Sequence, residues 1–316
     1  MLNTIDIDGR IKLIDLNDLN QPKRTGSYVL LEDSITLIET SASPSIPYLK
    51  EGLAKLNIGL DQIKYIILTH IHLDHGGGAG LFLKDCPNAQ IVVHPKAARH
   101  LIDPTRLELG ARAVYNEQFD QLFHPIIPIP KSRIITKENE ETLQIGSKTS
   151  LIFYDTPGHA NHHFGIYDPV SNGMFTGDTA GIYYWTLKEH GFDLFLPTTS
   201  PNQFNPLAMI ESIKFFEQKN LSVLYFGHFG FTKKVALALD TVKNWIHKFV
   251  ECSKKGYLSS ELDERRIENT YLALRAAIFD FLYSEQVPKD HPVFATLELD
   301  LKICSMGLID YLDKKE

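Results

Sequence analysis

The sequence predicts a layered α/β fold followed by a helical C-terminal region. A chain of 316 residues with 43% hydrophobic content can bury a large core. Up to about Gly230, short runs of β-branched and aromatic residues alternate with helical patterns. From Thr232 onward, apolar residues recur three and four positions apart instead. We therefore expect a main domain over residues 1–231 and a helical appendage over residues 232–316.

The main domain contains candidate strands that alternate with candidate helices. The expected strands are Tyr28 to Leu31, Ile35 to Ile38, Tyr65 to Leu68, Ile91 to Val93, Leu151 to Tyr154, Phe164 to Tyr167, Met174 to Thr176 and Val223 to Phe226. The expected helices are Pro47 to Leu56, Lys96 to Ile102, Arg106 to Phe123 and Pro206 to Gln218. Asn205 is suited to cap the last helix, with Pro206 in its first position. The Pro-rich segment from His124 to Pro130 predicts a loop.

The C-terminal appendage contains three apolar stripes with helical spacing. They are Val235, Leu239, Val242, Ile246 and Phe249; then Ile267, Tyr271, Leu274, Ile278 and Phe281; and finally Leu297, Leu301, Cys304, Leu308 and Tyr311. Each stripe suits a helix with one buried face.

Charge and composition argue against several partners and locations. A formal net charge of -7 gives no basic surface for a phosphate backbone, so we expect no nucleic acid partner. No apolar stretch reaches the length of a membrane-spanning helix, and the N-terminus does not resemble a signal peptide. Cys86, Cys252 and Cys304 lack metal-type spacing and suggest reduced structural thiols. We expect a cytoplasmic protein without a membrane partner.

The most informative segment is LTHIHLDHGGG. An apolar strand ends near Thr69, and His70, His72, Asp74 and His75 follow within six residues. On a loop after a strand, such a group of imidazoles and a carboxylate can bind metal ions, and the glycines allow tight turns. No structural need accounts for this spacing.

This pattern resembles the metallo-β-lactamase superfamily, whose hallmark H-x-H-x-D-H motif is matched by His70, His72, Asp74 and His75. Further matching residues follow predicted strands, namely His159 in DTPGHA, Asp178 in FTGDT and His228 in YFGHFG. The resemblance implies an αββα sandwich with a metal site along one edge of its two sheets.

The resemblance also implies the role of each ligand. His70, His72 and His159 would bind one metal, Asp74, His75 and His228 the other, and Asp178 would bridge the two. Two divalent transition-metal ions are expected. Zinc is the first choice, and iron and manganese are alternatives because imidazole and carboxylate ligands suit all three metals. A hydroxide bridging the ions would be the nucleophile, and we count Asp74 and Asp178 among the catalytic residues.

Differences among subfamilies narrow the expected activity. Metallo-β-lactamases proper lack the counterpart of Asp178, and flavodiiron proteins carry a glutamate in place of His72. RNA-processing members need basic surface or an inserted nuclease domain. The arrangement looks more like glyoxalase II and the lactonases, which predicts hydrolysis of an ester, thioester or lactone.

Several alternatives remain open at this point. The same dinuclear site can serve a phosphodiesterase, the fold can serve a ligand-binding regulator with little activity, and a single iron site can serve a dioxygenase acting on sulfur substrates. The expected partner is a small-molecule substrate, with homodimerisation as a weaker hypothesis.

Other residues near these motifs are weaker candidates. Tyr183 and Tyr184 follow Asp178, and together with Trp185 they can line a pocket; a tyrosine hydroxyl can donate to a substrate carbonyl. His94, at the end of the strand in IVVHP, is expected to be a capped, solvent-facing imidazole, with a contact to a metal ligand or the substrate as the alternative. Asp155 is assigned to turn chemistry.

Overall fold

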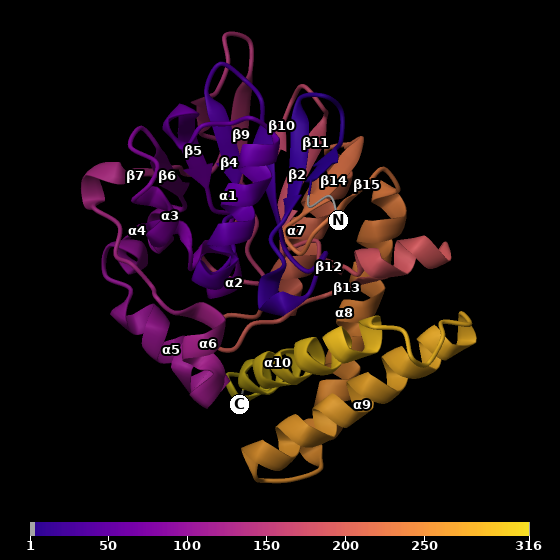
Figure 1. Ribbon diagram of the computed structural model, residues 1–316. Helices are drawn as coiled ribbons and strands as arrows, with labels where there is room; N and C mark the ends of the chain where they lie inside the picture. The colour runs from indigo at the N-terminus through magenta and orange to yellow at the C-terminus, as the bar shows by residue number, and fades with distance from the viewer. Residues whose placement is uncertain (1–3, 316) are drawn as a thin grey trace. The chain divides into compact units, whose positions relative to one another are not determined.

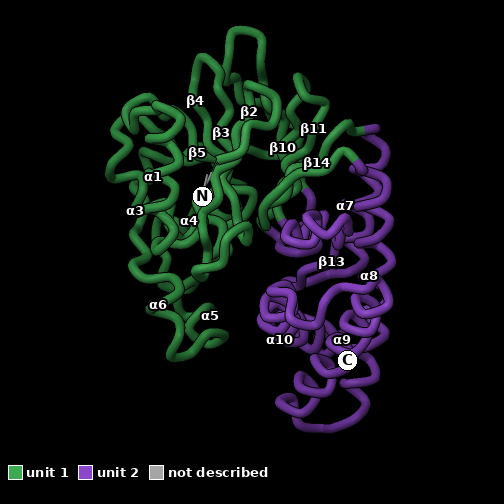
Figure 2. Tube along the Cα trace, turned by 45° about the vertical axis from the view of Figure 1, so that its right-hand side comes forward, with its two compact units in different colours: residues 1–155, 162–177, 221–233 green, residues 156–161, 178–220, 234–316 purple. Residues whose placement is uncertain are grey.

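The computed structural model describes residues 4–315, and it contains two compact units that each combine three stretches of the chain. The first unit holds the residues up to 155 together with 162–177 and 221–233. The second holds 156–161, 178–220 and the residues from 234 onward (Figure 2). The domain division expected at residues 231 and 232 stays a prediction.

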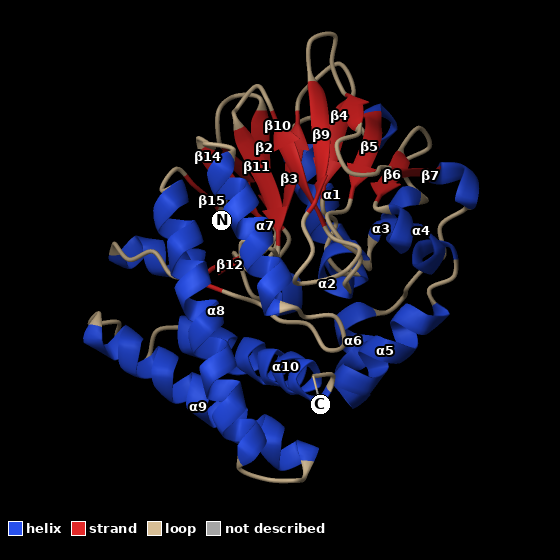
Figure 3. Cartoon of the chain, turned by 180° about the vertical axis from the view of Figure 1, so that it is seen from behind, coloured by secondary structure: helices blue, strands red, loops and turns tan. Residues whose placement is uncertain are grey.

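The described residues of the first unit form two sheets, drawn as red arrows in Figure 3. The first has the order β1-β2-β3-β4-β5-β6-β7. Its strands are antiparallel from β1 to β4 and parallel from β4 to β7. Their bounds are β1 (Thr4–Asp6), β2 (Ile11–Asp15), β3 (Gly26–Leu30), β4 (Ile35–Ile38), β5 (Ile63–Ile67), β6 (Gln90–Val93) and β7 (Ile134–Thr136).

The second sheet has the order β15-β14-β11-β10-β9-β8. It is antiparallel except between β11 and β14, which run parallel. The strands are β8 (Thr142–Gln144), β9 (Ser150–Asp155), β10 (Phe164–Asp168), β11 (Gly173–Gly177), β14 (Val223–Phe226) and β15 (Phe231–Thr232). All eight strands expected from the sequence are present.

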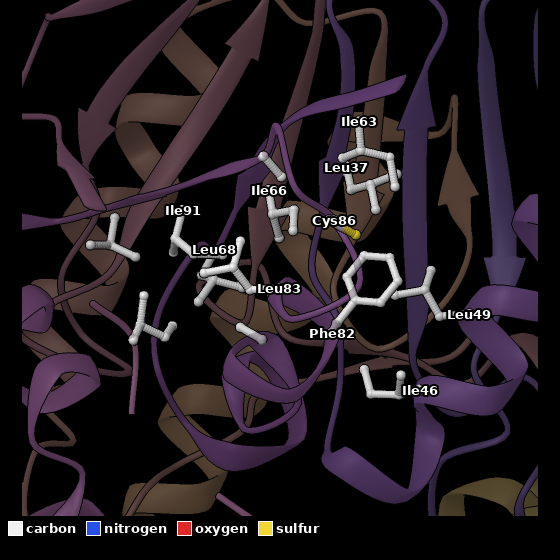
Figure 4. Close-up of a cluster of buried hydrophobic side chains, with 14 of the residues drawn as sticks. Leu37, Ile46, Leu49, Ile63, Ile66, Leu68, Phe82, Leu83, Cys86 and Ile91 are labelled. Atoms are coloured by element: carbon white, nitrogen blue, oxygen red, sulfur yellow. The ribbon is translucent and has the colours of Figure 1, made fainter. Parts of the chain in front are cut away.

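Helices cover the first sheet because their apolar faces pack on its parallel strands. These are α1 (Ile46–Lys55), α3 (Ala79–Leu83) and α4 (Pro95–Ile102). The unit also contains the single turn α2 (Leu73–Gly76) and the helices α5 (Thr105–Tyr115) and α6 (Phe119–Phe123), and Phe119 and Phe123 of α6 belong to a separate small cluster. Figure 1 shows α1 and α3 beside β4 to β6. Leu49 of α1 and Phe82 of α3 meet Leu37 of β4 and Ile66 of β5 in one buried cluster (Figure 4).

The long helix expected from Arg106 to Phe123 is wrong, because the chain forms two helices there. Asn116 separates α5 from α6 and has a positive φ of 47°. Its ψ of -125° also lies far from helical values, so a helix cannot continue through it. The expected loop from His124 to Pro130 is confirmed.

The second unit is mainly helical. It contains α7 (Pro206–Gln218), the short antiparallel pair β12 (Ile182–Tyr183) and β13 (Phe195–Leu196), and the helices α8 (Val235–Leu258), α9 (Asp263–Ser284) and α10 (Val293–Asp313). The Asn205 side chain caps α7 by accepting from the backbone N–H groups of Leu207 and Ala208, as expected. α9 packs against both α8 and α10 (Figure 1).

The three apolar stripes of the C-terminal region are largely buried. Leu239, Ile246, Leu274, Leu297 and Leu308 are each fully buried. The sequence prediction of a layered α/β fold with a helical C-terminal region is therefore confirmed. Within residues 4–315, no helix combines the length and the apolar character needed to cross a bilayer.

Candidate metal centre

The candidate site begins where neighbouring parallel strands of the first sheet end. β4, β5 and β6 run parallel, so their carboxyl ends lie at the same edge, where open α/β sheets commonly bind ligands. Glu39 follows β4, Thr69 and His70 follow β5, and His94 follows β6. All four of these polar residues are buried.

The histidines of the H-x-H-x-D-H motif lie against one another. After β5 the chain passes through His70 and His72 and enters the single turn α2, with His72 at its N-cap. The ring centroid of His70 is 4.6 Å from that of His72 and 4.2 Å from that of His75. The short connection between strand and helix therefore gathers these imidazoles in one place.

His228 joins this group from the second sheet. It follows β14, and its ring centroid is 5.0 Å from that of His75. Asp74, His75 and His228 each offer one donor atom, and these atoms lie within 4.8 Å of one another. Asp74 Oδ2 is 3.5 Å from His228 Nε2 and 3.8 Å from His75 Nε2.

The chemistry and spacing of these donors fit a divalent metal ion. Zinc takes imidazole nitrogens and carboxylate oxygens at about 2.0–2.2 Å, which puts neighbouring ligand atoms about 3.4 Å apart. His75 and His228 are almost fully buried, while the Asp74 side chain is 27% exposed. Two buried imidazoles and one accessible carboxylate thus form a group that can bind a metal and still admit water.

Glu39 is a site residue that the sequence analysis missed. Its Oε1 accepts a hydrogen bond of 3.0 Å from the Thr69 backbone N–H, and its Oε2 lies 3.5 Å from His75 Nδ1. A carboxylate on the second ring nitrogen orients a metal-binding histidine and leaves its Nε2 for the metal. Glu39 has a positive φ of 72°, the kind of backbone strain that is often found at functional sites.

The turn that carries His228 is held by the first sheet. The Tyr28 hydroxyl, on β3, lies 2.8 Å from the Phe226 carbonyl and 2.6 Å from the Gly230 carbonyl. Burial raises the pKa of Tyr28 well above its usual value, so the hydroxyl stays a donor. The turn that carries His228 is therefore held by Tyr28 at Phe226, before His228, and at Gly230, after it.

His159 and Asp178 come together within the second unit. His159 Nε2 is 3.5 Å from Asp178 Oδ2, and both residues are buried. His159 Nδ1 lies 3.1 Å from the Thr198 carbonyl, which can only accept, so this nitrogen carries the proton. Nε2 is therefore the ring nitrogen that faces the Asp178 carboxylate, and an imidazole nitrogen beside a carboxylate oxygen is a suitable pair of metal ligands.

The loop that presents His159 needs a glycine. Gly158 has a positive φ of 135°, and a side chain there would collide with the backbone of Met209 in α7. The Asn205 backbone N–H donates to the Gly158 carbonyl at 2.8 Å. The turn predicted in DTPGHA therefore depends on close packing against the start of α7.

Each of the two units holds part of the predicted ligand set. The first unit brings together His70, His72, Asp74, His75 and His228. The second unit brings together His159 and Asp178. The assignment of these residues to two metal ions bridged by Asp178 stays a prediction.

Two further histidines lie beside the motif. The His163 ring centroid is 5.0 Å from that of His70, and the His162 ring centroid is 5.6 Å from that of His72. Gly177 has a positive φ of 46°, and a side chain there would collide with His163 and Thr69. This close approach explains why glycine ends β11.

His94 differs from its expectation. It is the N-cap of α4, because its Nδ1 accepts from the Lys96 backbone N–H at 3.1 Å. The ring is buried, however, and Nε2 lies 3.3 Å from Asp155 Oδ1, so the expectation of a solvent-facing imidazole is wrong. Burial lowers the pKa of His94 more than Asp155 raises it. Asp155 is therefore a partner of His94 rather than only a turn residue.

The aromatic residues after Asp178 are buried and have carboxylate partners. The Tyr183 hydroxyl donates to Asp193, and the Tyr184 hydroxyl donates to Asp300 at 3.0 Å. Burial and Asp193 both raise the pKa of Tyr183. Either hydroxyl would have to leave its carboxylate before it donated to a substrate, and a catalytic role for these tyrosines stays a prediction.

A buried ion pair that the sequence did not reveal belongs to the first unit. Asp18 Oδ2 lies 3.3 Å from Arg24 Nε, in the loop between β2 and β3. Burial raises the pKa of Asp18 to about 6, Arg24 opposes this rise, and the charge of Asp74 adds to it. The influence of Asp74 indicates that the pair is close to the candidate metal ligands.

Comparison with known proteins identifies the family. A model of the metallo-beta-lactamase superfamily matches residues 23–237, a stretch that contains every predicted ligand. The chain belongs to the metallo-beta-lactamase superfamily.

The superfamily protein ST1585 of Sulfurisphaera tokodaii is 29% identical over 174 residues, covering 54% of this chain and 62% of its own. The crystal structure of ST1585 aligns with a TM-score of 0.63 and 20% identity, over 94% of this chain and 97% of that one. This likeness confirms the αββα sandwich of the superfamily.

Two enzymes also match over part of their length. The hydroxyacylglutathione hydrolase of Legionella pneumophila is 26% identical over 117 residues, 37% of this chain and 34% of that enzyme. The N-acyl homoserine lactonase AttM of Rhizobium radiobacter is 23% identical over 176 residues, 54% of this chain and 60% of that enzyme. In each case the match spans less than two thirds of the relative.

Proposed function

We propose that this protein is a two-metal hydrolase that acts on an ester, thioester or lactone. The observation that carries the proposal is the group of Asp74, His75 and His228, whose donor atoms lie within 4.8 Å of one another. Metal-binding histidines and carboxylates in a member of this superfamily support a metal-dependent hydrolase.

In this proposal the seven predicted ligands hold one pair of ions. His70, His72 and His159 would bind one ion, Asp74, His75 and His228 would bind the other, and Asp178 would contribute to both. When bound, divalent ions make hydroxide available from water near neutral pH and polarise the oxygen of the substrate. We propose zinc as the metal, because closely grouped imidazole and carboxylate ligands suit it, with iron and manganese as alternatives.

The protein residues orient the ligands and handle protons. The Glu39 carboxylate faces His75 Nδ1 at 3.5 Å, and the Thr198 carbonyl accepts a hydrogen bond from His159 Nδ1, so an acceptor lies on the second nitrogen of each ring. The Asp74 side chain is 27% exposed, whereas His75 and His228 are buried. The Asp74 carboxylate is therefore the group of this trio that water can reach, and we assign it to accept a proton during the reaction.

The substrate class is proposed from the relatives and from the side chains near Asp178. The matched enzymes are named for the hydrolysis of a thioester and of a lactone. The aromatic segment from Tyr183 to Trp185 suits the apolar part of an acyl substrate. We further propose a small-molecule substrate and a cytoplasmic location, the latter because all three cysteines are free buried thiols.

Metal analysis combined with a substrate panel tests the proposal. The zinc-loaded protein should bind about two ions per chain and hydrolyse a thioester, ester or lactone faster than a phosphodiester. Asp178→Ala should reduce binding of both ions, and His228→Ala should reduce binding of one. His247→Ala, which removes an exposed histidine of α8, is the control and should change neither.

Three results would reject the proposal in different ways. Absence of metal binding would reject the dinuclear site. Two bound ions without turnover of any substrate would favour a ligand-binding protein. Faster cleavage of a phosphodiester than of any acyl substrate would reject the acyl class and retain the metal site.

A further inference from the structure

We propose that the C-terminal helix α10 positions the predicted metal ligand His159. The inference rests on the proposed function, because it treats His159 as a ligand. Each contact that carries it lies within the second unit, and the link runs from α10 through the segment 198–200 to the imidazole.

The segment 198–200 holds His159 at two points. The Thr198 carbonyl accepts from His159 Nδ1 at 3.1 Å, and the Ser200 hydroxyl donates to the His159 carbonyl at 2.8 Å. The first bond sets the tautomer and the tilt of the ring, and the second fixes the backbone from which the ring projects. Any shift of the segment would therefore move Nε2.

The same segment is held from its other side by α10. The Thr199 hydroxyl donates to the Cys304 carbonyl at 2.7 Å, and both residues are buried. At Gly307, a Cβ atom would lie 2.8 Å from the Ser200 carbonyl carbon and oxygen and 2.8 Å from Thr199 Oγ1. The helix backbone therefore approaches the segment so closely that only glycine fits there.

The contacts continue along one face of α10. The Tyr184 hydroxyl donates to Asp300, the Tyr311 ring centroid is 5.9 Å from that of Phe204, and Lys314 Nζ donates to the Asn202 carbonyl at 2.8 Å. The residues involved are three or four positions apart, which places them on one side of the helix and its C-cap: Asp300, Cys304, Gly307, Tyr311 and the C-cap Lys314. One face of the helix thus contacts the segment 198–200 that holds His159 and also residues before and after that segment in the sequence.

This arrangement gives the helix a role in metal binding without contact between the helix and the ion. Partners that orient a metal-binding histidine typically change metal affinity by 10–100-fold when they are removed. Loosening the segment 198–200 should therefore lower the affinity for the one ion that His159 binds and leave the affinity for the other ion unchanged.

The test compares conservative variants of Thr199. Thr199→Val keeps the shape of the side chain but loses the donor to Cys304, whereas Thr199→Ser keeps the donor. Zinc ion alone is titrated into the metal-free full-length protein with a chromophoric chelator as competitor, and cobalt absorption reports the ligand geometry. We expect about 10–100-fold weaker binding of one ion in Thr199→Val and recovery of the affinity in Thr199→Ser.

Ser305→Ala is the matched control. It deletes a buried hydroxyl of α10 that bonds only within the helix, from Ser305 Oγ to the Leu301 carbonyl at 2.7 Å. It should reduce stability without changing either metal affinity. Should Thr199→Val fail to fold, Gly307→Ala provides the same comparison, because its Cβ pushes on Ser200 from the helix side.

The outcomes separate the inference from the proposed function. If the unmodified protein binds no zinc, the proposed function fails. If the unmodified protein binds zinc and Thr199→Val binds both ions as tightly as the unmodified protein does, the inference about α10 is overturned and the metal site stands. Equal loss of affinity in Ser305→Ala would also overturn it, because general loosening of the helix would then explain the effect.

Discussion

Replacement of Glu39 tests how the protein holds the imidazole of His75. Glu39→Gln keeps an oxygen that can accept from the Thr69 backbone N–H but removes the negative charge that faces His75 Nδ1. Glu39→Ala removes both. The pair of variants therefore separates orientation of the ligand from support of the loop.

The expected magnitudes follow from burial and geometry. The Ala variant leaves the buried Thr69 N–H without its acceptor, which costs about 1–3 kcal/mol, and it loses the charged partner of His75 as well. We expect the free energy of unfolding to fall by roughly 2–4 kcal/mol for Glu39→Ala and by less than about 1 kcal/mol for Glu39→Gln. Both variants should bind one metal ion about 10–100-fold more weakly.

Urea unfolding of the metal-free protein and zinc titration measure the two effects independently. Glu32→Gln is a suitable control, because Glu32 bonds to Arg10 and Thr149 rather than to a histidine. If Glu39→Gln bound zinc as tightly as the unmodified protein, the orienting role of the carboxylate would be refuted.

Three further predictions concern other parts of the molecule. Arg10→Met should lower the free energy of unfolding in urea by about 3 kcal/mol, because it removes the cation paired with the fully buried Asp168; a loss below about 1 kcal/mol would contradict this. In the metal-free protein the raised pKa of Asp18, about 6 in place of 3.8, means that the folded state holds its proton longer. Stability should therefore decrease by up to about 3 kcal/mol as the pH rises from 4 to 6, and Asp18→Asn should flatten that part of the pH profile measured by thermal unfolding. Tyr184→Phe removes the hydroxyl partner of the buried Asp300 and should lower the melting temperature; an unchanged kcat in the same variant would count against a catalytic hydroxyl.

The sequence predicted those site residues whose position follows from local spacing. His70, His72, Asp74 and His75 lie within one short loop, so a strand followed by a turn is enough to gather them. The cap at Asn205 and the three C-terminal helices were equally accessible, because capping and helical periodicity depend on neighbours in the sequence.

Residues whose role depends on distant partners escaped the sequence analysis. Glu39 is a single acidic residue after an apolar strand, and its partners become known only when β4 pairs with β5. The ion pair of Asp18 forms only because the loop between β2 and β3 brings Arg24 beside it. The break at Asn116 was missed because the residues on both sides continue the helical pattern. Short strands such as β12, with two residues, are too brief to show alternation.

The parallel pairing of β11 with β14 has a consequence for synthesis of the protein. Between these strands the chain makes residues 178–220, which belong to the second unit, so β11 leaves the ribosome before its partner exists. At roughly 5–20 residues per second, several seconds pass before β14 follows. During that interval one edge of β11, whose five residues are all buried in the finished fold, is open to pairing with another nascent chain. Slow synthesis of residues 178–226 would therefore favour aggregation.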